Sequence, residues 1–333
     1  MCLKPLKKSE VKKILVILLS NIGDVAVTLP VLDILIQEFP QSQISVVIGP
    51  KGESLFQKNP RIQPVYIFDK HQSWLKTMAL IAQLRQQHFD VVIDLRNTAI
   101  PFFLTPKFRT SFFYPRTRNR HMRLFHLDRL RSVIPFEEAT IVKKSLYISQ
   151  EEQRYTTNLI KTKIGEDTRF CVICPSAADH RKRWPSENFA ALGDRLVSTY
   201  GLKIVLVGEG EGEGIVDQIA QQMHQPSVKL KGETTLIQLA ELMKKASLVV
   251  ANDSGAMHLA SYLNVPVLAL FGPTEPQFAA PWSTKSFYLH KNDHCQTCRN
   301  PRLHFEHTCM QAISAEEAFE VIGVSAEGIY FKR

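Results

Sequence analysis

Residues 247–276, SLVVANDSGAMHLASYLNVPVLALFGPTEP, decide the fold predicted for this chain. Two short apolar runs, 247–251 and 266–271, are typical of strands buried on both faces of a parallel sheet. Between them, a polar turn leads into a predicted short helix at 256–263, which Asp253 or Ser254 would cap. Because both turns follow strands, they should lie at the carboxyl edge of the sheet, where open α/β folds bind ligands. Free N–H groups and the helix dipole make the first turn suitable for phosphate.

The same block resembles the donor-binding signature of glycosyltransferase family 9, the ADP-heptose:lipopolysaccharide heptosyltransferases. The likeness rests on DSGAMHLA at 253–260 followed by PVLALFGPTEP at 266–276. The resemblance implies that Ser254, Gly255 and His258 hold the donor diphosphate and that Asp253 orders the turn. A purely structural alternative is a β-α-β crossover in which Asp253 caps the helix and His258 faces the core.

Size, charge and cysteine content restrict the class of protein. The chain has 333 residues, which suggests two domains, and 44% hydrophobic with 22% charged residues is a globular composition. It has no apolar run of membrane-spanning length, and six cysteines are too few for a disulfide scaffold, so we expect a soluble cytoplasmic protein. The net charge of +9 favours an anionic partner, either a nucleotide or an anionic membrane surface. Nucleic acid is not expected, because no nucleic-acid motif is present.

The first half of the chain alternates predicted strands with predicted helices. Strands are expected at 14–19, 44–48, 65–68 and 91–95, and helices at 25–39 and 73–87. This alternation predicts a doubly wound parallel sheet.

The turn SNIGD at 20–24 also resembles family 9, whose first loop has a Gly-Asp pair followed by Thr-Leu-Pro, here 28–30. The resemblance implies that Asp24 is the general base. An inverting transfer needs such a carboxylate to take the proton of the attacking acceptor hydroxyl. The alternative is that Asp24 only caps the following helix.

A basic segment with interleaved aromatic residues occupies 107–131. Arginine binds phosphate and carboxylate groups through its planar guanidinium. The resemblance implies that the amino-terminal domain meets the lipopolysaccharide inner core, which is rich in both groups, so we interpret the segment as the acceptor- and membrane-facing surface. The acceptor-binding candidates are Arg116, Arg118, Arg120 and Arg123. The alternatives are a solvated basic face or an RNA-binding surface, whose affinity would fall steeply with salt.

A second alternating series starts after the polar helix predicted at 150–163. Ser176 follows a strand at 170–174, and the segment 182–185 matches the family's K-R-W-P block, which implies that Lys182 meets the donor diphosphate. The alternative for Lys182 is a surface lysine before a helix that starts with proline. The stretch GEGEGEG at 208–214 is not a dinucleotide fingerprint, because its glutamates would repel a pyrophosphate. In similar enzymes a carboxylate here holds the ribose; Glu209 is our candidate, with Glu211 and Glu213 as alternatives.

Histidines and cysteines cluster between 290 and 309. Cys295 and Cys298 have zinc-knuckle spacing, and Cys309 or His307 would complete the ligand set. The resemblance implies a cysteine-rich segment without a required metal, and this copy lacks one cysteine often found between Cys298 and Cys309. We predict no catalytic metal and no cofactor, and a structural zinc at the three cysteines stays open.

Taken with the resemblance, the sequence predicts a glycosyltransferase-B fold, with two Rossmann-like α/β domains facing across a cleft. The expected divisions are an acceptor domain at 1–150, a connecting helix at 151–168 and a donor domain at 169–333. The implied reaction is inverting heptose transfer from ADP-heptose to the lipopolysaccharide inner core, at the cytoplasmic face of the inner membrane. The alternatives are a family 9 enzyme with another nucleotide sugar or acceptor, and a non-catalytic nucleotide- or zinc-binding regulator of the same fold.

Overall fold

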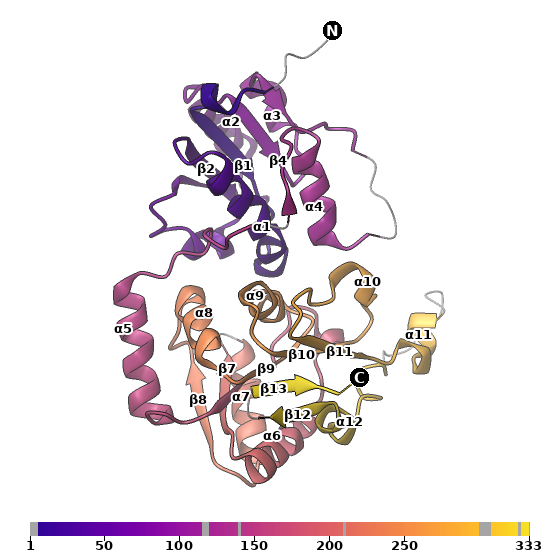
Figure 1. The fold of residues 1–333 in the computed structure, drawn as a ribbon. Coiled ribbons are helices and arrows are strands. Elements are labelled where there is room, and N and C mark those ends of the chain that lie inside the picture. Colours follow the sequence, from indigo (N-terminus) through magenta and orange to yellow (C-terminus); the bar gives the residue numbers. More distant parts are fainter. Residues whose placement is uncertain are drawn as a thin grey trace. The chain divides into compact units, whose positions relative to one another are not determined.

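The computed structural model describes residues 6–114, 120–138, 141–208, 211–299, 308–325 and 328–332. The chain divides into two compact units, Met1–Tyr147 and Ile148–Arg333, each with its own parallel sheet (Figure 1). The predicted helix at 150–163 is α5 (Gln150–Leu159), extended by a π turn at Ile160–Ile164, and both belong to the second unit. Within the described residues, no helix combines the length and apolarity that a membrane crossing requires.

The first unit is a five-stranded parallel sheet with the order β3-β2-β1-β4-β5. Its strands are β1 (Lys13–Ile17), β2 (Gln43–Ile48), β3 (Ile62–Ile67), β4 (Val91–Asp94) and β5 (Phe108–Arg109). Its helices are α1 (Ile22–Glu38), α2 (Trp74–Arg85), α3 (Ile100–Leu104) and α4 (Met122–Arg131), with 3-10 turns at Lys8–Glu10 and Pro50–Leu55. The strand order reverses between β1 and β4, so the loops after these two strands flank the switch point, where such sheets bind ligands.

All four predicted strands and both predicted helices of this unit are confirmed, with shifted ends. Helix α1 begins at Ile22 rather than Val25, so Gly23 and Asp24 belong to its first turn and not to a loop. The sequence analysis missed β5, α3 and α4, which are short or lie in the basic segment.

Helix α1 is the buried centre of the first unit, and every residue from Val25 to Ile36 is buried. This includes Asp33, which is 1% exposed. Its Oδ1 accepts hydrogen bonds from the backbone N–H groups of Lys144 and Ser145, at 2.6 and 2.7 Å. A buried carboxylate therefore fastens the last segment of the unit to its central helix.

The second unit is a six-stranded parallel sheet with the order β11-β10-β9-β6-β7-β8. Its strands are β6 (Phe170–Cys174), β7 (Lys203–Gly208), β8 (Ser227–Lys231), β9 (Leu248–Asn252), β10 (Val267–Phe271) and β11 (Ser286–His290). Its further helices are α6 (Ser186–Tyr200), α7 (Glu211–Gln222), α8 (Leu236–Lys245), α9 (Gly255–Leu263), α10 (Pro276–Ala279), α11 (Gln296–Arg299) and α12 (Ala315–Glu320). Here the order reverses between β6 and β9.

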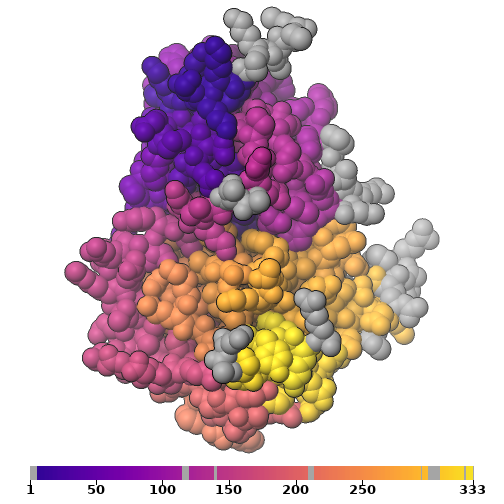
Figure 2. Space-filling model, in the orientation of Figure 1, coloured from indigo at the N-terminus to yellow at the C-terminus, as the bar shows by residue number. Residues whose placement is uncertain are grey.

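The quoted stretch forms the predicted strand, helix and strand: β9, α9 and β10. The sequence analysis missed β8 and β11, the outer strands of the sheet, and an antiparallel hairpin of β12 (Ile322–Ser325) and β13 (Gly328–Phe331). Part of this hairpin lies at the surface of the second unit (yellow in Figure 2), whereas Ile322 and Gly323 of β12 are buried.

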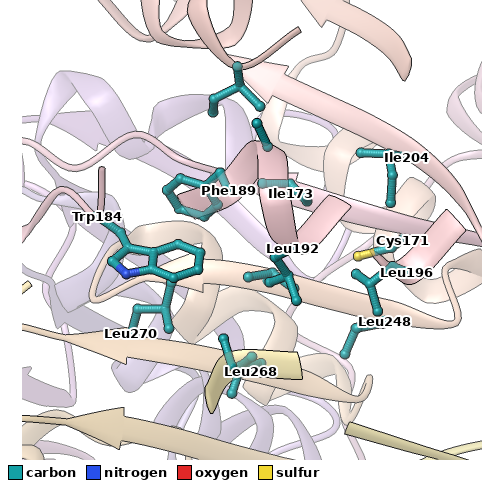
Figure 3. Packing of buried hydrophobic residues seen from close by; sticks show 14 of the residues in the cluster. Cys171, Ile173, Trp184, Phe189, Leu192, Leu196, Ile204, Leu248, Leu268 and Leu270 are labelled. Carbon is teal, nitrogen blue, oxygen red and sulfur yellow. The ribbon is translucent and has the colours of Figure 1, made fainter. Parts of the chain in front are cut away.

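The core of the second unit packs α6 against the sheet around Trp184 and Phe189, whose rings meet edge to face at 4.8 Å (Figure 3). The indole Nε1 of Trp184 donates to the carbonyl of Ile313 at 2.9 Å. Because Trp184 is 2% exposed, it fixes the loop between β6 and α6 in the core.

We expect Asp33→Ala to destabilise the first unit by roughly 2 to 4 kcal/mol, because it leaves two buried N–H groups without their acceptor. Hydrogen exchange should accelerate at the amides of Lys144 and Ser145, and urea unfolding should shift to lower concentration. Asp33→Asn is the matched control, since it keeps an acceptor oxygen. Equal losses in the two variants would show that these two bonds contribute little.

Candidate functional site

The switch point of the second unit is fastened by Asn252, the last residue of β9, which is fully buried. Its side-chain Nδ2 donates to the carbonyl of Pro175 at 2.6 Å, and its Oδ1 accepts from the Trp184 amide at 3.2 Å. One side chain thus joins the ends of β6 and β9 to the loop before α6. The sequence analysis missed this role, although a polar residue that closes an apolar run signals it.

Lys182 and Asp253 meet at this switch point. Lys182 lies in the 3-10 turn His180–Lys182 after β6, and its Nζ is 2.7 Å from Oδ2 of Asp253. The Asp253 side chain is 5% exposed and that of Lys182 is 27% exposed. The carboxylate therefore holds the ammonium group where it still reaches solvent. The two residues are far apart in the sequence, so this pair constrains the position of one loop relative to the other. Separating them would leave the buried carboxylate unpaired, which is costly.

His258 lies on the other side of Asp253. Its Nε2 is 3.9 Å from Oδ1 of Asp253, and its ring stacks on Trp282 with the centroids 5.9 Å apart. The structure therefore brings together three residues predicted for the donor site, Lys182, Asp253 and His258. Their role in binding stays a prediction.

Helix α9 begins at Gly255 with Ser254 in the N-cap position, but no side chain makes a capping hydrogen bond there. Of the two expected cap residues, Ser254 is confirmed as the N-cap residue, although its hydroxyl makes no capping hydrogen bond. Asp253 precedes the cap, and its carboxylate pairs with Lys182. The first N–H groups of a helix have no partner within it, so those of α9 are left to another acceptor. An anion suits this position.

Two serine hydroxyls at the same switch point add to this arrangement. The Oγ atoms of Ser176 and Ser254 are both buried and find no hydrogen-bond partner within the described residues. Ser176 follows β6 and Ser254 follows β9, which are neighbouring strands. Orphaned buried hydroxyls, uncapped helical N–H groups and a fixed ammonium group together suit a phosphate-bearing ligand.

The ribose candidate Glu209 lies outside the described residues, as does Gly210. Helix α7 begins at Glu211, so the second half of the glycine-glutamate stretch is helical. The side chains of Glu211 and Glu213 are likewise not described. The contact between one of these glutamates and the ribose stays a prediction.

In the first unit, Asp24 lies in the first turn of α1, directly after the loop that leaves β1. Its Oδ2 accepts a hydrogen bond from the Asn21 side chain at 3.0 Å. Within the described residues, this is the hydrogen bond that the carboxylate makes, and it is not a backbone cap. An acidic side chain in the first turn also stabilises the helix dipole, so the structural alternative stays open, and the role of Asp24 as a base stays a prediction.

Asp94, at the end of the neighbouring strand β4, is a carboxylate that the sequence analysis missed. It is 2% exposed, and its oxygens accept from the N–H groups of Arg96, Asn97 and Thr98. Burial raises the pKa of this carboxyl group, and the bonds from Thr98 oppose that rise. Its oxygens are thus committed to folding the loop after β4. An aspartate that closes the apolar run VVID was the available signal.

Two of the four predicted acceptor-binding arginines lie within the described residues. Arg116 and Arg118 lie outside the described residues. Arg120 pairs with Asp128 at 2.8 Å. Arg123 lies on α4, its Nε is buried without a hydrogen-bond partner among the described residues, and burial lowers the pKa of its guanidinium. Acceptor binding by these residues stays a prediction.

An exposed aromatic patch lies in the same part of the first unit. Its members are Phe102, Phe103, Phe112 and Phe113. Phe113 is 88% exposed, and Phe112 contacts both Phe102 and Phe113 edge to face. The guanidinium of Arg109 lies 4.1 Å from the centre of the Phe102 ring. The patch therefore combines apolar surface with a cation.

Comparisons with known proteins agree on one family. The model of glycosyltransferase family 9 (heptosyltransferase) matches residues 77–308, more than half of the chain. The chain is 25% identical to the lipopolysaccharide core heptosyltransferase OpsX of Haemophilus influenzae over 298 residues, which is 84% of each chain. It is 26% identical to lipopolysaccharide heptosyltransferase 2 of Escherichia coli over 304 residues, covering 82% of this chain and 86% of the relative.

Solved structures give the same result for the fold. The glycosyltransferase family 9 structure from Veillonella parvula superposes with a TM-score of 0.78 at 25% identity, covering 95% of this chain and 96% of that one. The structure of E. coli ADP-heptose lps heptosyltransferase II gives 0.73 at 23% identity, with 92% and 96% covered. The predicted glycosyltransferase-B fold is confirmed.

If Lys182 binds the donor diphosphate as predicted, Lys182→Ala should weaken ADP binding at least roughly tenfold, because it would remove a charge-assisted contact. Calorimetric titration measures this directly. Lys229→Ala is the matched control, since Lys229 also pairs with an aspartate, Asp217, in the same unit, and it should bind ADP like the parent chain. Unchanged affinity in Lys182→Ala would remove Lys182 from the donor site.

Proposed function

Because the chain belongs to glycosyltransferase family 9, we propose that it transfers L-glycero-D-manno-heptose from ADP-heptose to the inner core of lipopolysaccharide, with inversion. The names of its relatives support the sugar and the acceptor. The observation that carries the proposal is the contact between Lys182 and Asp253 beside the uncapped start of α9. It gives the donor unit the features that a nucleotide diphosphate requires.

The donor diphosphate would bind at the switch point of the second unit. The N–H groups at Gly255 and the hydroxyls of Ser176 and Ser254 would donate to its oxygens, and Lys182 and His258 would supply positive charge or further hydrogen bonds. As the bond between the anomeric carbon and the phosphate oxygen breaks, negative charge grows on the departing ADP. A fixed ammonium and helix N–H groups stabilise that charge without reorganising.

Asp24 would be the general base that takes the proton from the attacking acceptor hydroxyl. Two observations favour it over Asp94. The oxygens of Asp94 already accept hydrogen bonds from three backbone N–H groups. The described hydrogen bond of Asp24 comes from the side-chain amide of Asn21. That bond would orient one carboxylate oxygen and leave the other to face the acceptor.

We expect Asp24→Asn to lower turnover at least about a hundredfold and to leave ADP affinity unchanged, because the amide cannot accept the proton. Asp90→Asn is the matched control. Asp90 lies just before β4, at the opposite end of the strand from the switch point, and its carboxylate accepts hydrogen bonds from the backbone N–H groups of Lys12 and Lys13. This variant should retain most of the parent turnover. Near-normal turnover in Asp24→Asn would exclude the base role.

The reaction itself is tested by incubating the protein with ADP-heptose and a set of truncated lipopolysaccharide cores, and measuring the products by mass spectrometry. The proposal predicts that one core gains a single heptose and that ADP is released. Transfer of another sugar from another nucleotide would keep the family activity and reject heptose. ADP binding without transfer to any acceptor would favour the non-catalytic alternative.

We also propose that the first unit contacts the cytoplasmic face of the inner membrane through the aromatic patch and Arg109. Exposed phenylalanines gain free energy when they enter the acyl boundary, and arginine is attracted to anionic headgroups. The net charge of +9 acts in the same direction. This contact would bring the enzyme to an acceptor that is anchored in lipid.

We expect the double substitution Phe112→Ser and Phe113→Ser to lower partitioning onto anionic phospholipid vesicles at least roughly tenfold. Cosedimentation measures the bound fraction. Tyr330→Ser, at an exposed aromatic of β13, controls for the loss of surface aromatic area. If both variants partition alike, the patch is not the membrane contact.

A further inference from the structure

Three cysteine thiols converge in the second unit, and we propose that they bind a divalent transition metal, zinc in the first instance. The metal would fasten the carboxyl-terminal segment to the loop that carries Lys182. The thiols belong to Cys295, Cys298 and Cys309, and their Sγ atoms all lie within 4.8 Å of one another. The Sγ atoms of Cys298 and Cys309 are 3.8 Å apart. The metal site does not depend on the proposed reaction; only its effect on ADP binding does.

The separation of the Cys298 and Cys309 sulfurs fits a tetrahedral metal, because zinc–sulfur bonds of about 2.3 Å place neighbouring sulfurs about 3.8 Å apart. The Cys295 sulfur lies within 4.8 Å of both, so a small side-chain movement would complete the set. Soft thiolate ligands in this geometry select zinc or iron over magnesium and calcium. On binding, each thiol that becomes a ligand releases its proton to solvent.

The backbone presents the thiols from two separate segments. Cys295 closes the 3-10 turn Asn292–His294, and Cys298 lies one turn further on α11. Cys309 comes from the segment that leads to α12. Cys295 and Cys309 are fully buried and Cys298 is partly buried. Buried cysteines can pack in the core without touching one another. The convergence of three thiols from two segments is therefore better explained by a shared ligand.

The other buried cysteines of the second unit form a useful contrast. Cys171 and Cys174 lie on β6, and Cys171 belongs to the apolar core. Neither belongs to a cluster of three potential metal ligands among the described residues. They therefore serve as packing residues and provide a matched substitution.

The segment after Cys309 contacts the turn after β10 and the loop between β6 and α6, which carries Lys182. Gly272, in the turn after β10, is packed closely between Met310 and the backbone of Arg181. If Gly272 were replaced by a residue with a Cβ atom, that atom would lie 2.9 Å from Sδ of Met310 and 3.0 Å from the carbonyl oxygen of Arg181, which is too close for either contact. The carbonyl of Ile313 accepts from Trp184, as described above, and from the Asn188 side chain at 3.3 Å. A metal at Cys309 would therefore hold residues 308–313 against the loop that carries Lys182.

The test begins with the metal content of the full chain, purified under reducing conditions. We expect close to one zinc or iron ion per chain, and at least about tenfold less in Cys298→Ala and Cys309→Ala. Cys174→Ala should keep its metal. Replacement by Co²⁺ should give the thiolate charge-transfer and tetrahedral d–d absorption bands, and the charge-transfer intensity reports the number of thiolate ligands.

Two results would overturn the proposal. One is a metal-free protein that gives no thiolate–cobalt absorption when Co²⁺ is added. The other is a disulfide between Cys298 and Cys309, found by peptide mapping without reduction. Removing the metal should also weaken ADP binding several-fold, and unchanged affinity would reject the link to the donor turns. If no form of the protein binds ADP, the proposed function fails, whereas the metal measurement still decides the site.

Discussion

The ion pair between Lys182 and Asp253 is the contact on which the proposed donor site depends. A lysine is mobile and strongly hydrated, so it marks a ligand position only if a partner fixes it. Asp253 supplies this partner from the loop after β9, and Asn252 beside it ties the same loop to Pro175 and Trp184. The next residue, Ser254, is the N-cap residue of α9 but makes no side-chain capping hydrogen bond. A fixed cation and free helix N–H groups therefore lie at the same switch point.

Parallel topology explains why residues far apart in sequence meet in each unit. In both sheets the strand order reverses once, between β1 and β4 and between β6 and β9, and the candidate residues follow these strands. Under the proposed function, the two units would take different roles because they carry different charges. The second unit combines cationic and N–H groups suited to a leaving diphosphate, whereas the first unit offers the carboxylate of Asp24, suited to taking a proton.

The sequence was sufficient for the features that depend on local pattern. Apolar runs and polar turns predicted β1, β6, β9 and their following loops, and the family signature made Asp24, Lys182 and Asp253 candidate site residues. Features that depend on tertiary contacts were missed. Asn252 joins residues of two other loops, and Asp94 accepts hydrogen bonds that form only once the loop after β4 has folded. Asp253 pairs with a lysine 71 residues away in the sequence. The outer strands β8 and β11 are partly exposed, so they lack a continuous apolar signal.

The most direct test of the central claim is a calorimetric titration of the purified protein with ADP, UDP and GDP. The account predicts binding that is selective for ADP and that is lost in Asp253→Ala, because that substitution releases Lys182 from the switch point. Preference for UDP or GDP would contradict heptose as the transferred sugar. Absence of binding to all three nucleotides would contradict the donor site itself.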